Sequence, residues 1–413
     1  DLPALPADRI ALDDARFELV TPEGVATGTL SGALDVAPDG AVAGGVALAL
    51  DHPLGVAEGQ LDLEGRLDAL AFRAELEGRA AQAGRRVAAW ARGRADATTG
   101  AGEAEWTLAP LVFAPEGLQP AALYPPLAPL ALSDVAGRVE ARGRVTRDAA
   151  GALAWTAAVA CRDLAASTPL ARVEGVHGAL SLAGPPLHTP ERQVVSIGLL
   201  DVGVPITEGL VEATLRPDGA LALRRARFSF AGGTLETGAT VVDPGTGLGA
   251  VTLRATDLDL ARLLERVQLA GLTGTGQVEG ELPLVREDGA LAVRGGVLRA
   301  TSAGGTIRYA PAASVRGLAE SRPYDLGLAV EAFSDFRYQA LEARIDGELD
   351  AALTVGLHVR GVNPDFQDGR PVELNLNLEA HLADLVRAGQ ASYRVPAVVE
   401  ERLRAFSEGR ASP

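Results

Sequence analysis

The sequence of 413 residues contains no lysine, no methionine and only one cysteine, Cys161. A single cysteine excludes an intrachain disulfide and a thiolate-bound metal cluster. Without lysine, the chain cannot form the phosphate-binding loop of P-loop nucleotide enzymes, which depends on that residue. Because methionine is absent even at position 1, we expect this sequence to be a mature or excised piece of a longer protein.

Positive charge and aromatic side chains are also scarce. The 38 basic residues, all of them arginine, face 54 acidic ones and leave a formal net charge of −16. This excess of acid argues against nucleic acid as a partner, because binding a phosphate backbone requires clustered positive charge. Hydrophobic residues make up 47% of the chain but aromatic ones only 4%, so the apolar content is mainly Ala, Leu and Val.

Long apolar runs are missing as well. Charge-free stretches such as Gly117–Ser133 and Gly175–Pro190 are interrupted by proline. They are also shorter than the ~20 residues that a membrane-spanning helix needs. We therefore predict neither a transmembrane helix nor a signal peptide within this sequence.

Short alternating runs dominate what is present. In residues 372–379, Val and Leu alternate with Glu and Asn, and residues 353–360 and 139–145 alternate in the same way. A period of two places the apolar side chains on one face of a strand and the polar ones on the other. One wet face and one dry face is typical of antiparallel sheet.

Turn signals separate these runs, at residues 38–40 and 217–219 (Pro-Asp-Gly), 243–245 (Asp-Pro-Gly) and 288–289 (Asp-Gly). Asp and Gly tolerate the positive φ angles that tight hairpin turns require. We therefore predict an all-β fold, an elongated and strongly curved antiparallel sheet built from successive hairpins and shaped like a groove.

Helices are expected to be few. Asp259 precedes an i, i+3, i+4, i+7 apolar stripe that begins at Leu260, which predicts a capped short helix ending near Gly271. Residues 381–413 are predicted to form a helical segment and tail. The proline-rich segment 117–133 cannot be a central strand. We interpret it as a break between an N-terminal part, 1–115, and a larger β region, 116–380.

The residues that usually carry chemistry do not form a recognisable pattern. The five histidines are scattered without the i, i+4 spacing of zinc-binding helices. The glycine-rich run 245–249 lies between two strand-like runs, with no helix to receive a pyrophosphate. No Gly-x-Ser-x-Gly motif occurs, and Cys161 has no histidine close in sequence. We therefore expect no catalytic residues, no metal and no cofactor, although spacing alone does not separate a glycosidase pair from surface acids.

Five segments of the last third stand in a recognisable order: Gly271–Leu284 (GLTGTGQVEGELPL), Gly304–Pro311 (GGTIRYAP), Ser334–Tyr338 (SDFRY), Asn363–Phe366 (NPDF) and Gly369–Glu379 (GRPVELNLNLE). In order and approximate spacing they resemble the C-terminal portion of the YdbH family, which belongs to the AsmA-like, bridge-type lipid-transfer proteins of Gram-negative envelopes. The resemblance covers about residues 130–379.

This resemblance implies a periplasmic, non-enzymatic conduit that moves glycerophospholipid between the inner and outer membranes along an apolar β-groove. It also implies an inner-membrane anchor upstream of this sequence and an outer-membrane lipoprotein partner at the C-terminal end. Such a role would contribute to outer-membrane biogenesis.

Under this reading, the groove is lined by apolar residues from the inward faces of successive strands. The expected lining residues are Leu221, Leu223, Phe228, Phe230, Val251, Leu253, Leu353, Val355, Leu357, Val372, Leu374, Leu376 and Leu378. The same alternation also fits a sheet that packs against a second sheet around a filled core. The pattern itself favours the filled core, whereas the family resemblance favours the open groove.

Two other functions remain as alternatives. One is a structural or assembly scaffold of the TamB type, which would present strand edges to outer-membrane partner proteins by β-augmentation. The other is an envelope enzyme on a β scaffold, which would need a compact polar pocket.

Overall fold

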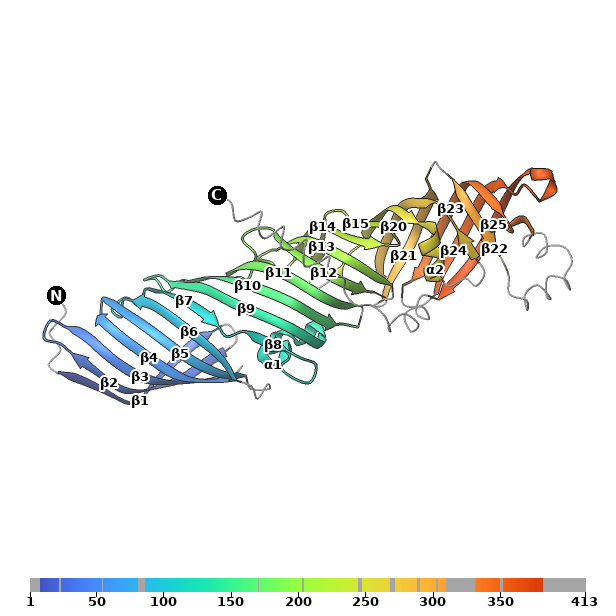
Figure 1. Cartoon of the computed structure of the whole chain (residues 1–413). Helices are drawn as coiled ribbons and strands as arrows, with labels where there is room; N and C mark the ends of the chain where they lie inside the picture. The colour runs from blue at the N-terminus through green and yellow to red at the C-terminus, as the bar shows by residue number, and fades with distance from the viewer. Residues whose placement is uncertain are drawn as a thin grey trace. The chain divides into compact units, whose positions relative to one another are not determined.

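The computed structural model describes residues 8–21, 24–53, 55–80, 86–169, 171–202, 204–243, 247–267, 272–287, 290–301, 304–309, 331–349 and 352–381. Strands β1 to β25 dominate these residues (Figure 1), and the helices whose bounds lie within them, α1 and α2, are short. Every strand pairing with a residue register is antiparallel, for example β3 with β4 and β24 with β25. The expected all-β, antiparallel fold class is confirmed.

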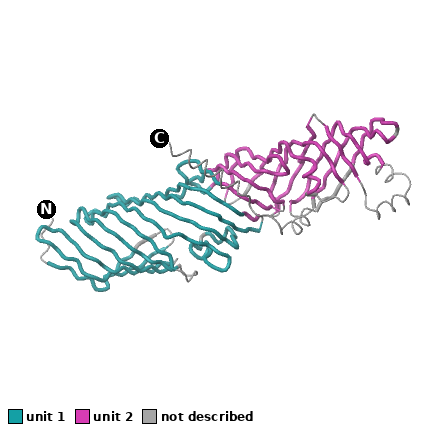
Figure 2. Tube along the Cα trace, in the orientation of Figure 1, with its two compact units in different colours: residues 1–169, 174–195, 214–219 teal, residues 170–173, 196–213, 220–413 magenta. Residues whose placement is uncertain are grey.

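The chain divides into two compact units, shown in different colours in Figure 2. Unit 1 comprises residues 1–169, 174–195 and 214–219, and unit 2 comprises residues 170–173, 196–213 and 220–413. The boundary expected at residues 115–116 lies inside unit 1, and the division of roles that it implied stays a prediction.

Unit 1 is a ladder of hairpin-connected strands. Its strands are β1 (Arg9–Thr21), β2 (Gly24–Val36), β3 (Ala41–His52), β4 (Gly55–Arg66), β5 (Ala69–Ala80), β6 (Arg86–Ala95), β7 (Gly102–Leu108), β8 (Leu111–Phe113), β9 (Ser133–Arg147), β10 (Leu153–Ser167) and most of β11 (Arg172–Gly184). From β1 to β7 each strand pairs with the next, and β7 then pairs with β9, which pairs with β10.

The turn between β2 and β3 forms for the reason that the sequence suggested. Gly40 has a φ of 81°, in the left-handed region that favours glycine. The carboxylate of Asp39 accepts a hydrogen bond of 3.2 Å from the backbone N–H of Ala41. The turn fixes the register of the two strands, which pair from Val36↔Val42 to Thr27↔Asp51.

The proline-rich segment leaves the ladder and returns to it, as helix α1 (Pro120–Leu123) and the 3₁₀ helix η1 (Pro125–Leu130). The Gln119 side chain anchors it on β9, because its amide donates to the carbonyl of Val135 (2.9 Å) and accepts from the Val135 N–H (3.1 Å). Phe113, Leu118 and Val135 form a small buried cluster beside it. Strands β7 and β9 pair directly across this insertion, so the ladder continues past it.

Unit 2 contains the later strands and helix α2 (Leu260–Val267). The strands are β14 (Leu221–Phe230), β15 (Gly233–Thr237), β16 (Thr240–Asp243), β17 (Gly247–Leu248), β18 (Val251–Asp259), β19 (Leu272–Gly274), β20 (Gln277–Glu287), β21 (Ala290–Ala300), β22 (Gly305–Tyr309), β23 (Phe336–Glu348), β24 (Ala352–Val362) and β25 (Pro371–His381), with the 3₁₀ helix η2 (Gln367–Gly369) between the last two. Strands β12 (Gln193–Asp201) and β13 (Pro205–Leu215) contribute residues to both units.

Helix α2 begins where the sequence predicted. The Asp259 carboxylate accepts hydrogen bonds from the backbone N–H groups of Ala261 (2.8 Å) and Arg262 (3.2 Å), which is the geometry of an N-cap. Leu260 is buried in the largest apolar cluster of unit 2, and Leu263 and Leu264 pack against that cluster. The helical segment expected over residues 381–413 lies outside the described residues, apart from His381 at the end of β25.

The turn between β6 and β7 yields a prediction about pH. Asp96 accepts hydrogen bonds from the Thr98 side chain, the Thr99 side chain (2.8 Å) and the Thr98 N–H (2.8 Å), which together lower its pKa to about 2. Because this pKa lies below the ordinary value of 3.8, the carboxylate contributes stability above pH 4 and loses it as the pH falls towards 2. An NMR titration of the Asp96 carboxyl should give a midpoint of about 2. A midpoint near the ordinary value would contradict this turn geometry.

Candidate functional site

One face of the unit 1 ladder is apolar across eight strands, β2–β7, β9 and β10, and Phe17 of β1 extends one row of this face. Directly paired residues in an antiparallel sheet point to the same side, so the strand registers define cross-strand rows on this face. The four rows are Phe17, Gly28, Leu50, Ala57, Gly78 and Val87; Leu30, Leu48, Gly59, Leu76, Ala89 and Leu108; Val46, Leu61, Ala74, Ala91, Trp106, Gly143 and Ala157; and Leu34, Gly44, Leu63, Phe72, Gly93, Ala104, Val145 and Trp155. We call these rows the apolar face of unit 1, and none of its residues is charged.

Much of this face is accessible in the described residues. All its Leu, Phe and Trp side chains are half-buried, whereas Val46 (1% exposed), Ala74 (7%) and Ala157 (8%), all in the third row, are buried. Within the residues that the structure describes, none of the four rows belongs to either of the two buried apolar clusters. The strands of the ladder make their main contacts with their hydrogen-bonded neighbours. The apolar face of unit 1 is therefore a surface on which an apolar ligand can lie.

The opposite face of the same strands is charged and solvated. Arg92 and Arg144 contact the Glu105 carboxylate at 2.9 and 3.4 Å, and both side chains are mostly exposed. The hydrogen bond from Arg92 is the main reason that the pKa of Glu105 lies below its ordinary value. Exposed pairs of this kind contribute about 0–1 kcal/mol each, so their main effect is to keep this face in water.

The expected lining residues lie in unit 2, and their surroundings differ. Phe228 (8% exposed), Val251 (6%) and Leu353 (8%) are buried, whereas Leu221 is exposed (39%). Five of them, Leu223, Phe230, Leu357, Val372 and Leu374, are half-buried and pack against the large apolar cluster of unit 2. Leu253 and Val355 are half-buried, and the side chains of Leu376 and Leu378 lie outside the described residues. That all of these residues line a groove remains a prediction.

The register of β24 and β25 does bring part of this set together. Leu357 pairs with Leu376, Val355 with Leu378, and Val359 with Leu374, so the apolar positions of the two strands share one face. On the other face His358 lies 3.2 Å from the Glu373 carboxylate and 2.8 Å from Asn375 Oδ1. The sequence predicted this separation of apolar and polar positions correctly.

Part of the sheet surface of unit 2 is covered by the protein's own side chains. The large apolar cluster contains Leu260 from α2, Ile307 from β22, Phe333 from the segment before β23, and Phe336 and Val359 from the sheet. Phe336 and Val359 are completely buried, and the Phe333 and Phe336 rings lie 5.2 Å apart. Unit 2 thus has a packed core where unit 1 has an open face.

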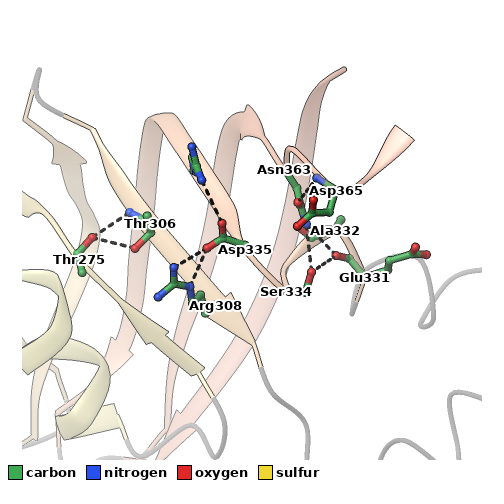
Figure 3. A network of polar contacts seen from close by, with 10 residues as sticks. Thr275, Thr306, Arg308, Glu331, Ala332, Ser334, Asp335, Asn363 and Asp365 are labelled. Carbon is green, nitrogen blue, oxygen red and sulfur yellow. Dashed lines mark hydrogen bonds and ion pairs between the residues drawn. The ribbon is translucent and has the colours of Figure 1, made fainter. Parts of the chain in front are cut away.

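The sequence motifs of the last third converge on one polar network beside this core (Figure 3). Thr275 and Thr306 are joined by their hydroxyls (2.9 Å), and Arg308 donates to Asp335 (2.7 Å). The buried Asn363 amide donates to the carbonyls of Glu331 and Ala332 (both 3.0 Å) and to the Ser334 hydroxyl (3.1 Å). Four of the five motif segments are therefore joined to one another, and their polar residues hold the segment before β23 on the sheet.

Local charge and burial fit a structural role for this network. The hydrogen bond from Arg308 is the main reason that the pKa of Asp335 is lowered, and Arg337 adds to the effect. Burial raises the pKa of Tyr338, whose hydroxyl donates to the Thr275 carbonyl at 2.8 Å. Asp335 and Tyr338 each keep one protonation state at neutral pH, as expected of side chains that hold the segment before β23 on the sheet.

Sequence reasoning did not identify the apolar face of unit 1. The signal was present in runs such as Ala57–Leu63 and Leu70–Leu76, whose alternation is as regular as that of residues 372–379. The alternating pattern does not reveal which face of the sheet stays uncovered, because the elements that cover a face are distant from it in sequence.

Among the described residues, every helix is too short or too polar to span a bilayer. No group of three or more His, Cys, Asp or Glu side chains in those residues is placed to hold a metal ion. Burial raises the pKa of the Cys161 thiol, which disfavours the reactive thiolate.

Comparisons with known proteins gave one match. A family model described as YdbH-like, intermembrane phospholipid transport protein YdbH, matches residues 30–404. Neither the curated proteins nor the solved structures contain a match. The matched range includes both the apolar face of unit 1 from Leu30 onward and the motif network of unit 2.

The role of Asn363 in fastening the segment before β23 to the sheet can be tested by measuring the free energy of unfolding. Asn363 is 1% exposed, so the Asn363→Ala substitution removes the Asn363 donor from the buried Ala332 carbonyl, whereas the Glu331 carbonyl keeps the Ser334 N–H and hydroxyl. A buried group left without a partner costs about 1–3 kcal/mol, and we expect the free energy of unfolding to fall by about that amount. Equilibrium urea unfolding followed by circular dichroism measures this change. As a matched control, Asn375→Ala removes an exposed amide and should change stability by less than about 0.5 kcal/mol; equal effects of the two substitutions would refute the fastening role.

Proposed function

The chain belongs to the YdbH-like family, whose function is intermembrane phospholipid transport, and from this premise we propose that it is a non-enzymatic conduit for glycerophospholipid. In this proposal, the acyl chains lie on the apolar face of unit 1 and on the accessible apolar positions of unit 2, and the headgroups stay in water. The single observation that carries it is the apolar face of unit 1, whose Leu, Phe and Trp side chains stay half-buried and outside both buried apolar clusters.

The energetics of this face suit a carrier. Keeping an acyl chain out of water is worth ~0.8 kcal/mol per methylene, or roughly 10 kcal/mol for a long chain. An open sheet face covers one side of the chain and recovers part of that sum, without polar groups that would hold the lipid at one place. Eight strands spaced about 4.8 Å apart extend the face by roughly 35 Å along the ladder. A lipid on such a face is bound firmly enough to leave water and loosely enough to move.

The expected lining residues of unit 2 keep a place in this proposal. Leu357, Val372 and Leu374 are half-buried and pack against the large apolar cluster, so part of their surface can contact an acyl chain. Phe228 lies within that cluster.

The family supports a proposal for the location and partners of the conduit. We propose that the full-length protein lies in the periplasm and is anchored in the inner membrane by a segment upstream of residue 1. We further propose that its C-terminal end meets an outer-membrane lipoprotein. The TamB-type scaffold is the alternative, and it differs in what should contact the chain: proteins at strand edges in place of lipid on the apolar face.

Photocrosslinking in cells tests the conduit with a matched control. A photoreactive residue at Leu61 sits on the apolar face of β4, whereas one at the adjacent Gln60 sits on the exposed polar face. In the full-length protein we expect phospholipid adducts from position 61 and none above background from position 60. Leu357 and the exposed Thr354 form an equivalent pair on β24.

The outcomes separate the two functions. Phospholipid captured at positions 61 and 357 but not at 60 and 354 supports the conduit. Absence of lipid at positions 61 and 357 would contradict the conduit, and protein adducts from probes placed on strand edges would then favour the scaffold. Equal lipid capture on both faces would show that the adducts report membrane proximity alone, and the conduit would lose its main support.

A further inference from the structure

The aromatic residues on the apolar face of unit 1 share an unusual arrangement: each ring lies against a glycine of a neighbouring strand. At Gly28 a Cβ atom would lie 2.2 Å from Cζ of Phe17, its direct partner across the β1–β2 pair. At Gly184 a Cβ would lie 2.6 Å from Cζ2 of Trp155. Real Cβ atoms do not approach so closely, so each ring occupies the volume in which a side chain would stand.

The other two rings of this face follow the same rule. A Cβ at Gly93 would lie 2.8 Å from Phe72 Cζ, and one at Gly143 would lie 2.6 Å from Trp106 Cζ2. Both glycines are the direct cross-strand partners of those rings. Every aromatic residue in the four rows is therefore matched with a glycine.

A left-handed backbone does not explain the glycines at positions 28 and 184. Neither has a φ in the left-handed region. At both positions the three atoms nearest to an added Cβ all belong to the aromatic ring. At Gly93 and Gly143, by contrast, a neighbouring backbone carbonyl also lies within about 2 Å of the added atom. Gly28 and Gly184 thus isolate the effect of the ring.

A related pair in unit 2 shows what such a ring does in a packed core. A Cβ at Gly209 would lie 2.3 Å from Cε1 of Phe228, but this ring is 8% exposed and belongs to the large apolar cluster. There the ring has no free space into which it can rise. The rings of Phe17 and Trp155 are half-buried, so part of each ring is accessible.

We propose that the glycines of these pairs are positioning residues for lipid passage, because each lets an aromatic ring lie flat on the sheet instead of standing up into the path. The inference rests on the proposed function and adds a determinant of its geometry. A ring that lies flat presents an apolar surface to an acyl chain without narrowing the path. A side chain at the glycine forces the ring upward, into the volume that the acyl chain would occupy.

The test uses the full-length protein with a photoreactive residue at Leu50, which pairs directly with Gly28. In Gly28→Ala we expect phospholipid capture at position 50 to fall about fivefold, since a raised ring and an acyl chain cannot share one close-packed volume. The double substitution Gly28→Ala with Phe17→Ala removes the ring and should restore capture. Gly184→Ala, with Trp155→Ala as its suppressor and a photoreactive residue at Val145, repeats the test at a second pair.

Each outcome decides the inference. Loss of capture in the single variant and recovery in the double variant supports it. Unchanged capture in Gly28→Ala and Gly184→Ala, or loss that the ring deletions do not rescue, overturns it, because the glycines would then act through the backbone or not at all. Absence of lipid at positions 50 and 145 in the unsubstituted protein would instead refute the proposed function. Gly209→Ala is a contrast, expected to lower the melting temperature because the buried Phe228 ring cannot move away.

Discussion

Alternation with a period of two, kept in register across many strands, is the constraint on which the structure depends. On the apolar face of unit 1, four cross-strand rows run through up to eight strands without a charged residue. A slip of one residue in β4 alone would bring Glu58 and Asp62 onto this face, and the Leu61 side chain would then point towards water. The salt bridges of the opposite face, such as Arg86–Glu77 at 2.8 Å, resist such a slip together with the turns. Register therefore determines whether an apolar path exists.

The two units use this alternation in different ways. In unit 1 the apolar face is uncovered, and a glycine next to each aromatic ring allows that ring to lie flat on the sheet. In unit 2 the cluster around Phe336 and Leu258 fills part of the sheet face, and the Asn363 network holds the covering segment in place. In the proposed conduit, the apolar face of unit 1 would carry the lipid, and the packed cluster of unit 2 would contribute stability.

Much of the fold followed from sequence because it depends on local pattern. The alternating strands, the turn at Asp39–Gly40 and the start of α2 after Asp259 are local features, and the structure confirms all three. The site was harder to predict. Phe228 and Leu353 were expected to line a groove but are buried, because residues far apart in sequence, such as Leu260, Ile307 and Phe333, build the cluster of unit 2. The pairing of Phe17 with Gly28 likewise depends on register, which composition and periodicity do not specify.

Tryptophan fluorescence offers the most direct measurement of whether lipid lies on the uncovered face. Trp106 lies on the apolar face of unit 1 and Trp90, 45% exposed, on the polar face of the neighbouring strand. Variants that retain only one of these tryptophans can be mixed with phospholipids brominated in the acyl chain, which quench a nearby indole. The account predicts strong quenching of Trp106 and none of Trp90. Equal quenching of both, or none of either while the protein carries lipid, would contradict it.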